Sequence, residues 1–145
     1  MELNMVATGI EFVGATIRSI SVENNIVDVD RESKRSIGLT INEPLFEKNE
    51  NGIFSQLTID FDIEIRQPED QKCEIKLSLE GAFISGEGVE EETFKQLVII
   101  NGAAALIGIA RGKIEAITAS IFNNGKVVIP FINVVDYYKS LSELT

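Results

Sequence analysis

Residues 57–66, LTIDFDIEIR, alternate apolar and polar side chains without interruption. The apolar side chains are Leu57, Ile59, Phe61, Ile63 and Ile65. Successive side chains of a β-strand point to opposite faces of a sheet, so this pattern predicts an antiparallel strand with one face in the core and the other in solvent.

Further alternating runs surround this strand. After a turn-rich stretch at residues 67–71, the apolar positions are Cys73, Ile75, Leu77 and Leu79, which predicts a hairpin. Residues 37–41 alternate as well, and residues 9–23 predict a strand whose inward register changes near Gly14, as a β-bulge would allow. We therefore expect a four-stranded antiparallel sheet.

The hydrophobic period changes to about 3.5 residues after this sheet. Apolar residues then recur at alternating spacings of 3 and 4: Ile100, Ala103, Ile107, Ala110, Ile114, Ile117 and Ile121. This spacing predicts a long amphipathic helix. Its opposite side is small rather than charged, with Gly102, Ala105, Gly108, Gly112, Ala116, Ala119 and Ser120.

This helix side of small residues predicts close packing against another element. Glycine inside a helix costs up to about 1 kcal/mol relative to alanine, so Gly108 and Gly112 need a packing reason or mark a break in the helix. One sheet covers only one side of the helix, which favours a homo-oligomer, a dimer or a tetramer. The expected interface is Ala105, Gly108, Gly112, Ala116 and Ala119. The alternative is a contact with the C-terminal segment of the same chain.

The C-terminal part is predicted to be extended and then helical. Residues 126–133 are mostly apolar, and Pro130 confines them to a sheet edge or a loop. Residues 136–141 suit a short helix. The whole is an α+β fold, and residues 1–145 have the length of a single domain.

Composition argues against catalysis and against nucleic acid. The chain has 13 Lys and Arg, 23 Asp and Glu, no His and the single cysteine Cys73, with a net charge of −10. Acidic chains repel phosphates, and the commonest general base and metal ligand is missing. One cysteine forms neither an intramolecular disulfide nor a thiolate zinc site. We predict a binding protein rather than an enzyme, with no cofactor and no metal.

Two segments bear on location. Residues 1–6 lack the basic and apolar regions of a signal peptide, so we expect a cytoplasmic protein. Residues 97–110 are apolar but interrupted by Asn101 and shorter than the roughly 20 residues needed to span a bilayer. We expect a buried helix here and no direct membrane insertion.

Other residues that could form a functional site are better explained by a structural role in the fold. Three carboxylates share a strand face at spacings of roughly 7 Å, which suits a hard cation or a solvated face: Asp60, Asp62 and Glu64. Alternation itself requires polar residues there, which favours the solvated face. Cys73 lies on the apolar side of its strand. The glycines match no phosphate-binding motif and are interpreted as turn and crossover residues: Gly81, Gly86 and Gly88.

Large apolar side chains near the ends of elements are candidates for a peptide-binding groove. Phe83 and Ile84 end one predicted strand, and Phe131 and Ile132 lie in the extended C-terminal segment. Such residues line grooves for extended peptides in some proteins, although ordinary core is their commoner fate.

The order of these features resembles the SecB family of protein-export chaperones. The similarity runs from residue 73 to about residue 141, nearly half of the chain, and is weaker upstream. Its anchors, specific in their order, are Cys73-Glu74-Ile75, Glu80-Gly81-Ala82-Phe83-Ile84, Gly86-Glu87-Gly88, Ile109-Ala110-Arg111, Asn124-Gly125 and Pro130 through Tyr138.

The resemblance implies a homotetramer that holds unfolded polypeptides without ATP in apolar grooves. The matching groove positions are Phe83, Ile84, Phe131, Ile132 and Val134. In exporting members of the family, acidic residues dock a translocation motor ATPase. Glu23 and Glu74 occupy matching places, whereas Ser19 stands where those members have an acid.

Two hypotheses follow, because relatives of this kind differ in their partners. Residues 107–109 replace a proline-containing stretch of the family, a departure that bears on motor docking more than on the fold. The first hypothesis is a holdase for unfolded or nascent chains, linked to export. The second is a dedicated subunit that keeps the scaffold but recognises one partner, such as an antitoxin.

Overall fold

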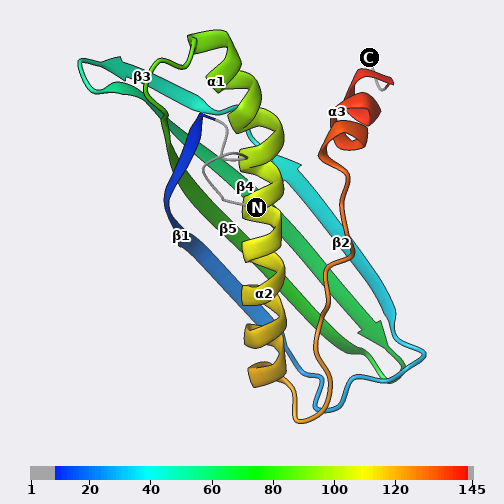
Figure 1. Ribbon diagram of the computed structural model, residues 1–145. Helices are drawn as coiled ribbons and strands as arrows, with labels where there is room; N and C mark the ends of the chain where they lie inside the picture. The colour runs from blue at the N-terminus through cyan, green and yellow to red at the C-terminus, as the bar shows by residue number, and fades with distance from the viewer. Residues whose placement is uncertain (1–8, 144–145) are drawn as a thin grey trace, which may run out of the picture.

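A computed structural model describes residues 9–143, and the residues from which a cytoplasmic location is expected lie outside that range. The elements are β1 (Ile10–Asn24), β2 (Lys34–Ile41), β3 (Leu45–Asn49), β4 (Gly52–Gln67), β5 (Gln71–Ser85), α1 (Glu91–Leu97), the π-helical turn η2 (Val98–Gly102), α2 (Ala103–Ile121) and α3 (Val134–Glu143). One long helical run crosses one face of the sheet, and the chain then returns beside it to α3 (Figure 1).

The antiparallel sheet has the order β1-β5-β4-β2, with β3 also paired to β4. It contains five strands rather than the expected four, yet it is four strands wide. β2 pairs with residues 59–66 of β4 and β3 with residues 52–56, so the two share one edge. The interruption falls at residues 42–44, where Pro44 has no N–H for a sheet ladder.

The predicted alternation is confirmed in β4 and β5. All the apolar side chains of the quoted stretch are buried on the helix side, and the polar ones lie on the opposite face, called the outer face below. β1 carries two register shifts, between Phe12 and Gly14 and between Ile17 and Ser19. The first confirms the β-bulge expected near Gly14, which keeps the strand's apolar residues toward the helix.

The long helix is confirmed and begins earlier than the isoleucine pattern indicated. Glu91 and Glu92 lie in its first turn, where the helix dipole favours negative charge. Its buried stripe is Phe94, Val98, Ala103, Leu106, Ile107, Ala110, Ile114 and Thr118, while Ile100, Ile117 and Ile121 are half-buried at its margin.

The apolar helix is also longer than the 14 residues considered from the sequence. Residues 91–121 form one run of 31 residues with a mean hydropathy of 1.6 in its most apolar part, which meets the length and composition of a membrane-spanning helix. Helices that pack on a sheet share these properties, and the buried stripe packs this helix on β4 and β5.

Gly81 is a packing residue rather than the turn residue expected. It lies inside β5, directly beneath the long helix, and an added Cβ would come 2.4 Å from Cδ2 of Leu106. The glycine therefore allows Leu106 to reach the sheet. Gly88, in the crossover before α1, has φ of +76°, which agrees with the turn role predicted for it.

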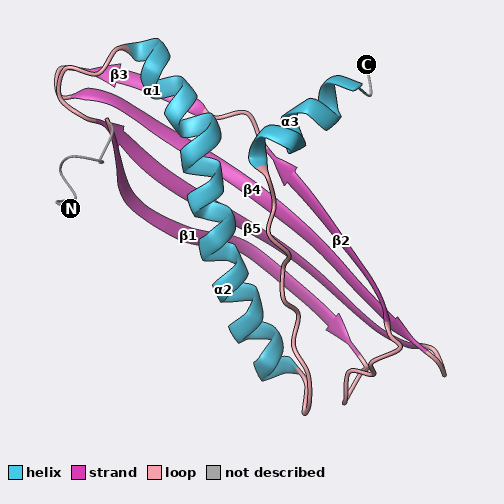
Figure 2. Cartoon of the chain, turned by 45° about the vertical axis from the view of Figure 1, so that its right-hand side comes forward, coloured by secondary structure: helices cyan, strands magenta, loops and turns pink. Residues whose placement is uncertain are grey.

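Residues 125–133, called the C-terminal strap, run back along α2 toward α3 (Figure 2). The strap is extended, as predicted, and pairs with no strand among residues 9–143. Val127 and Ile129 are buried, whereas Val128 and Pro130 face outward. The strap thus covers part of the core beside α2.

Candidate functional site

One side of α2 holds the C-terminal strap through its backbone. Arg111 Nε donates to the carbonyl of Ile129 at 2.9 Å, and Arg111 Nη2 donates to the carbonyl of Pro130 at 3.1 Å. One turn further on, Glu115 pairs with Lys126 at 2.5 Å. A single guanidinium therefore satisfies two carbonyl groups that no strand partner reaches.

Thr118 completes this attachment in the interior. Its hydroxyl accepts a hydrogen bond from the N–H of Val127 at 2.8 Å and donates to the carbonyl of Ile114 at 2.7 Å. Both residues are buried, so each hydrogen bond replaces one lost to water. Arg111, Glu115 and Thr118 stand at i, i+4 and i+7, which places them on one side of the helix.

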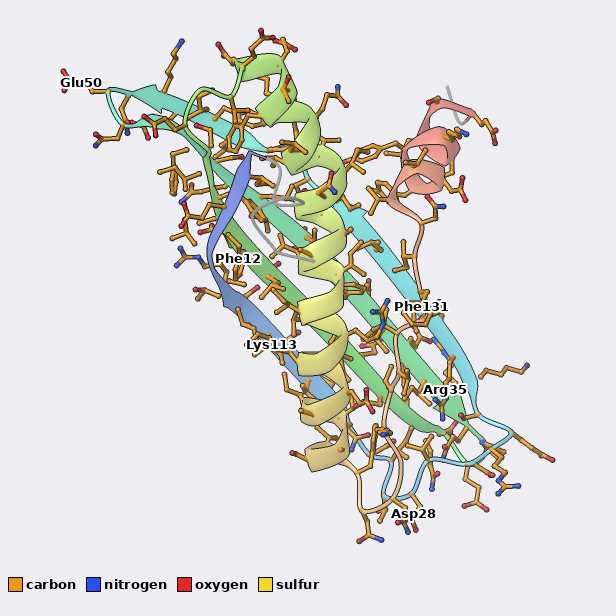
Figure 3. The ribbon with its side chains drawn as sticks, in the orientation of Figure 1. Phe12, Asp28, Arg35, Glu50, Lys113 and Phe131 are labelled. Carbon is orange, nitrogen blue, oxygen red and sulfur yellow. The ribbon has the colours of Figure 1, made fainter. Side chains whose placement is uncertain are left out.

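The strap presents an exposed aromatic ring. Phe131 is 93% exposed and lies over the Arg111 guanidinium, with 4.6 Å from Arg111 Cζ to the ring centroid. Figure 3 shows Phe131 on the strap between the long helix and β2. Val128 and Val135 are exposed nearby in the sequence. A ring held by a cation and open to water is suited to contact an apolar side chain of another polypeptide.

An apolar pocket of about 280 Å³ lies at the α3 end of β2. It is lined by Ile41, Asn42, Glu43, Pro44, Ile99, Tyr138 and Leu141. The adjacent Tyr137 hydroxyl accepts a hydrogen bond from the N–H of Ile41 at 2.9 Å and so attaches α3 to the strand. Burial, and then the neighbouring Tyr137, raise the pKa of Tyr138 above its ordinary value.

The structure separates the groove residues predicted from the sequence. Phe131 and Ile132 lie together on the strap, exposed and half-buried. Phe83 is 2% exposed and Val134 is 5% exposed, so neither offers surface within one chain. Ile84 follows Phe83 in β5 and lies on the outer face. Their role in peptide binding stays a prediction.

Tyr138 and Leu141, the pocket residues on α3, were not chosen from the sequence, unlike Val134 of the same helix, although a signal was present. Val134, Tyr137, Tyr138 and Leu141 stand at i, i+3, i+4 and i+7, the spacing of an amphipathic helix. The remaining walls come from the break between β2 and β3 and from Ile99. No local pattern brings these three segments together.

The predicted docking residues lie opposite each other on the outer face. Glu23 of β1 pairs in register with Glu74 of β5, and both border a shallow hollow. Lys72 Nζ is 2.8 Å from the Glu74 carboxylate. This hydrogen bond and charge lower the pKa of Glu74, so the ion pair is present above the ordinary carboxyl pKa and is lost as pH falls through the lowered one.

The three strand carboxylates behave as polar groups of a sheet face. Asp60 accepts hydrogen bonds from the Asn42 amide at 2.8 Å and from the Ser78 hydroxyl. Glu64 pairs with Arg66. Among residues 9–143, no group of His, Cys, Asp and Glu has the arrangement of a metal site.

The small face of α2, defined by Ala105, Gly108, Gly112, Ala116 and Ala119, is exposed along its whole length. A Cβ added at Gly108 or Gly112 would meet no atom of the described residues within 4 Å. The C-terminal strap lies on the Arg111 side of the helix and leaves this face open, which contradicts the intramolecular alternative. The packing reason for the two glycines is not found among residues 9–143.

Cys73 is expected to be unreactive in the folded protein. It is buried, and desolvation followed by the nearby Glu74 charge raises the pKa of its thiol. We predict that a thiol reagent labels native protein slower than denatured protein, on the order of a hundredfold or more. Labelling rates measured with and without denaturant test this, and equal rates would show that the thiol is accessible.

Comparison with known proteins supports the fold. No protein-family model matches the chain, and no curated protein matches it. The SecB-like chaperone Rv1957 of Mycobacterium tuberculosis, solved with a ChAD peptide from the Rv1956 HigA1 antitoxin, aligns with a TM-score of 0.60. The alignment covers 86% of this chain and 91% of that one at 9% identity. The chain therefore has a SecB-like fold.

A second solved structure is less similar. A protein of unknown function from Streptococcus agalactiae aligns over 86% of this chain and 99% of its own, with a TM-score of 0.43 and 10% identity.

Proposed function

We propose that this protein is a SecB-family holdase that binds unfolded or nascent polypeptides without ATP. The observation that carries the proposal is the exposed Phe131 ring, held on Arg111, in a chain that has a SecB-like fold and a separate apolar pocket between β2 and α3. The free energy falls when apolar side chains of an unfolded chain leave water and contact such a surface.

Charge supports the choice of partner. The chain carries a net charge of −10, which attracts basic segments and keeps the protein away from nucleic acid. Glu23 and Glu74 are the proposed contacts for a translocation motor ATPase in the cytoplasm, because they share one site on the outer face. Binding and release require no bond-making chemistry, so no cofactor is proposed.

The proposed active form is a homo-oligomer. The exposed small face of α2 lets another helix approach closely, and β1 exposes Phe12, Ile20 and Val22 on the helix side of the sheet. A second copy of the chain covers both surfaces in the proposed dimer, and two dimers form the proposed tetramer. The mass in solution, measured by light scattering, distinguishes a monomer from these assemblies.

An aggregation assay tests the holdase proposal. Wild-type protein is expected to suppress aggregation of a chemically denatured test protein, and Phe131→Asp is expected to need about tenfold more protein for the same effect. The matched control is Val27→Asp, since Val27 is also exposed but lies in the loop after β1. If the wild-type protein does not suppress aggregation of the test protein, the holdase proposal is wrong.

A second candidate is a subunit dedicated to one partner. It is favoured by the structural neighbour, a SecB-like chaperone that was solved with a peptide from an antitoxin. Co-purification separates the two candidates. One stoichiometric partner supports the dedicated subunit, whereas a broad set of nascent chains supports the general holdase.

A further inference from the structure

β2 forms the border of the sheet opposite β1, with α3 at one of its ends (Figure 1). Its backbone shows which groups point into the sheet. The N–H of Asn42, just past the strand, donates to the carbonyl of Thr58 on β4 at 3.0 Å. The N–H of Ile41 points the other way, to the Tyr137 hydroxyl at 2.9 Å.

The directions of these two N–H groups show which backbone groups of β2 are unpaired. In an antiparallel strand, the backbone groups of neighbouring residues point to opposite sides, so Ile37 and Leu39 direct theirs away from β4, as Ile41 does. Within residues 9–143, no hydrogen-bond partner reaches the backbone groups of Ile37 or Leu39. The last outward N–H of the strand, that of Ile41, is occupied by the Tyr137 hydroxyl.

The two sides of this border differ in chemistry. On the helix side, the half-buried Ile37 and Leu39 adjoin the core, and Phe131 is exposed on the strap nearby (Figure 3). On the outer face, Gly38 has no side chain and borders an open hollow of about 620 Å³ whose charged lining residues are Asp60, Asp62 and Lys76, so carboxylates outnumber the one cation. Neither carboxylate forms a salt bridge within the described chain.

We propose that β2 accepts an extended segment of the bound polypeptide as an additional strand, and that Tyr137 marks where this strand ends. The inference rests on the proposed function and specifies how the client's main chain is held. The free backbone groups of Ile37 and Leu39 bind the client backbone, while α3 blocks the pairing position of Ile41.

The same geometry selects the side chains of the client. Client residues that face the helix side are expected to be apolar, because they would adjoin Ile37, Leu39 and Phe131. Residues that face the outer side are basic or small, since Gly38 leaves the path toward Asp62 open. Proline is disfavoured at positions whose N–H pairs with β2.

A second copy of the chain fits the opposite border better. β1 is longer and exposes apolar side chains on the side where the small face of α2 is also exposed. β2 instead has α3 over one end and carboxylates beside its middle. We therefore assign β2 to the client rather than to self-association.

Amide hydrogen exchange with a synthetic peptide that alternates valine and lysine tests this assignment. The peptide is expected to slow exchange at the N–H groups of Ile37 and Leu39 about tenfold or more, with little change at Ile41. Tyr137→Phe removes the acceptor, so exchange at Ile41 becomes fast in the free variant and stays fast with peptide, because α3 still blocks this position. Tyr138→Phe, one residue along α3, is the control and leaves Ile41 unchanged.

Each other result has a definite meaning. Peptide binding without slower exchange at Ile37 and Leu39 overturns strand addition and leaves the holdase proposal intact. If the peptide does not bind but the protein still suppresses aggregation of the denatured test protein, strand addition alone is overturned. If it does neither, strand addition and the holdase proposal are both overturned. The amides of Ile37 and Leu39 could also exchange slowly in the protein without peptide and exchange faster once the protein is diluted. That result would assign β2 to a second copy of the chain and would also overturn the inference.

Discussion

Phe83→Ala is expected to lower the free energy of unfolding by about 3–5 kcal/mol, the range for removing a buried aromatic ring from a core. The ring is 2% exposed and packs against Gly102, where an added Cβ would come within 3.2 Å of its Cζ. Its centroid lies 5.8 Å from that of Phe12. Helix and sheet cannot close the cavity fully, because both are rigid elements.

Urea denaturation followed by circular dichroism measures this loss, which corresponds to a melting temperature lower by about 10 °C. Phe131→Ala is the matched control, because its ring is 93% exposed and its removal should change stability by less than about 1 kcal/mol. Similar losses in the two variants would contradict the assignment of Phe83 to the core. The control variant should instead lose holdase activity.

The contrast between these two phenylalanines shows what the sequence could predict. Phe83 continues the alternation of β5, so its place in the core follows from its position in the strand. Its position near the end of a strand, and separately the resemblance to SecB proteins, grouped it with Phe131 as a groove residue. Periodicity indicates which face a side chain takes, but it does not show how much of that face another element covers.

The same limit applies to the rest of the fold. Alternation identified the β4 and β5 hairpin, and the change of period identified the long helix, because each pattern is local. The division of one edge into β2 and β3 was missed, since the pairing of β2 ends before Pro44 and that of β3 begins at Leu45, directly after it. The π-helical turn was missed as well; its Gly102 packs on the Phe83 ring, a contact between distant segments that no local pattern indicates.

The candidate site was predicted only in part because it forms between distant segments. Phe131 was identified from the sequence, but its ring is positioned by Arg111, 20 residues earlier on the long helix. Tyr137 was identified only as part of a short helix, and its hydroxyl reaches the border of β2. These contacts depend on where the strap runs, which no periodic pattern encodes.

Arg111→Met is expected to lower the free energy of unfolding by about 2–3 kcal/mol, because two hydrogen bonds from a charged donor to strap carbonyls are lost. Methionine keeps the apolar stem of the side chain but has no N–H groups for Ile129 and Pro130. Once this attachment weakens, opening of the strap exposes Val127 and Ile129, which are buried in the native protein. Denaturant unfolding and the fluorescence of a dye that binds apolar surface measure both effects.

Lys113→Met is the matched control, since Lys113 lies on the same helix and forms no salt bridge with the described residues. Its effect should stay within about 0.5 kcal/mol. Arg111→Lys should fall between the two, because an ammonium retains the charge without the planar fork that reaches both carbonyls. Equal stability of the Arg111→Met and Lys113→Met variants would mean that burial of Val127 and Ile129 holds the strap without Arg111, and that Phe131 is positioned by the core rather than by the helix.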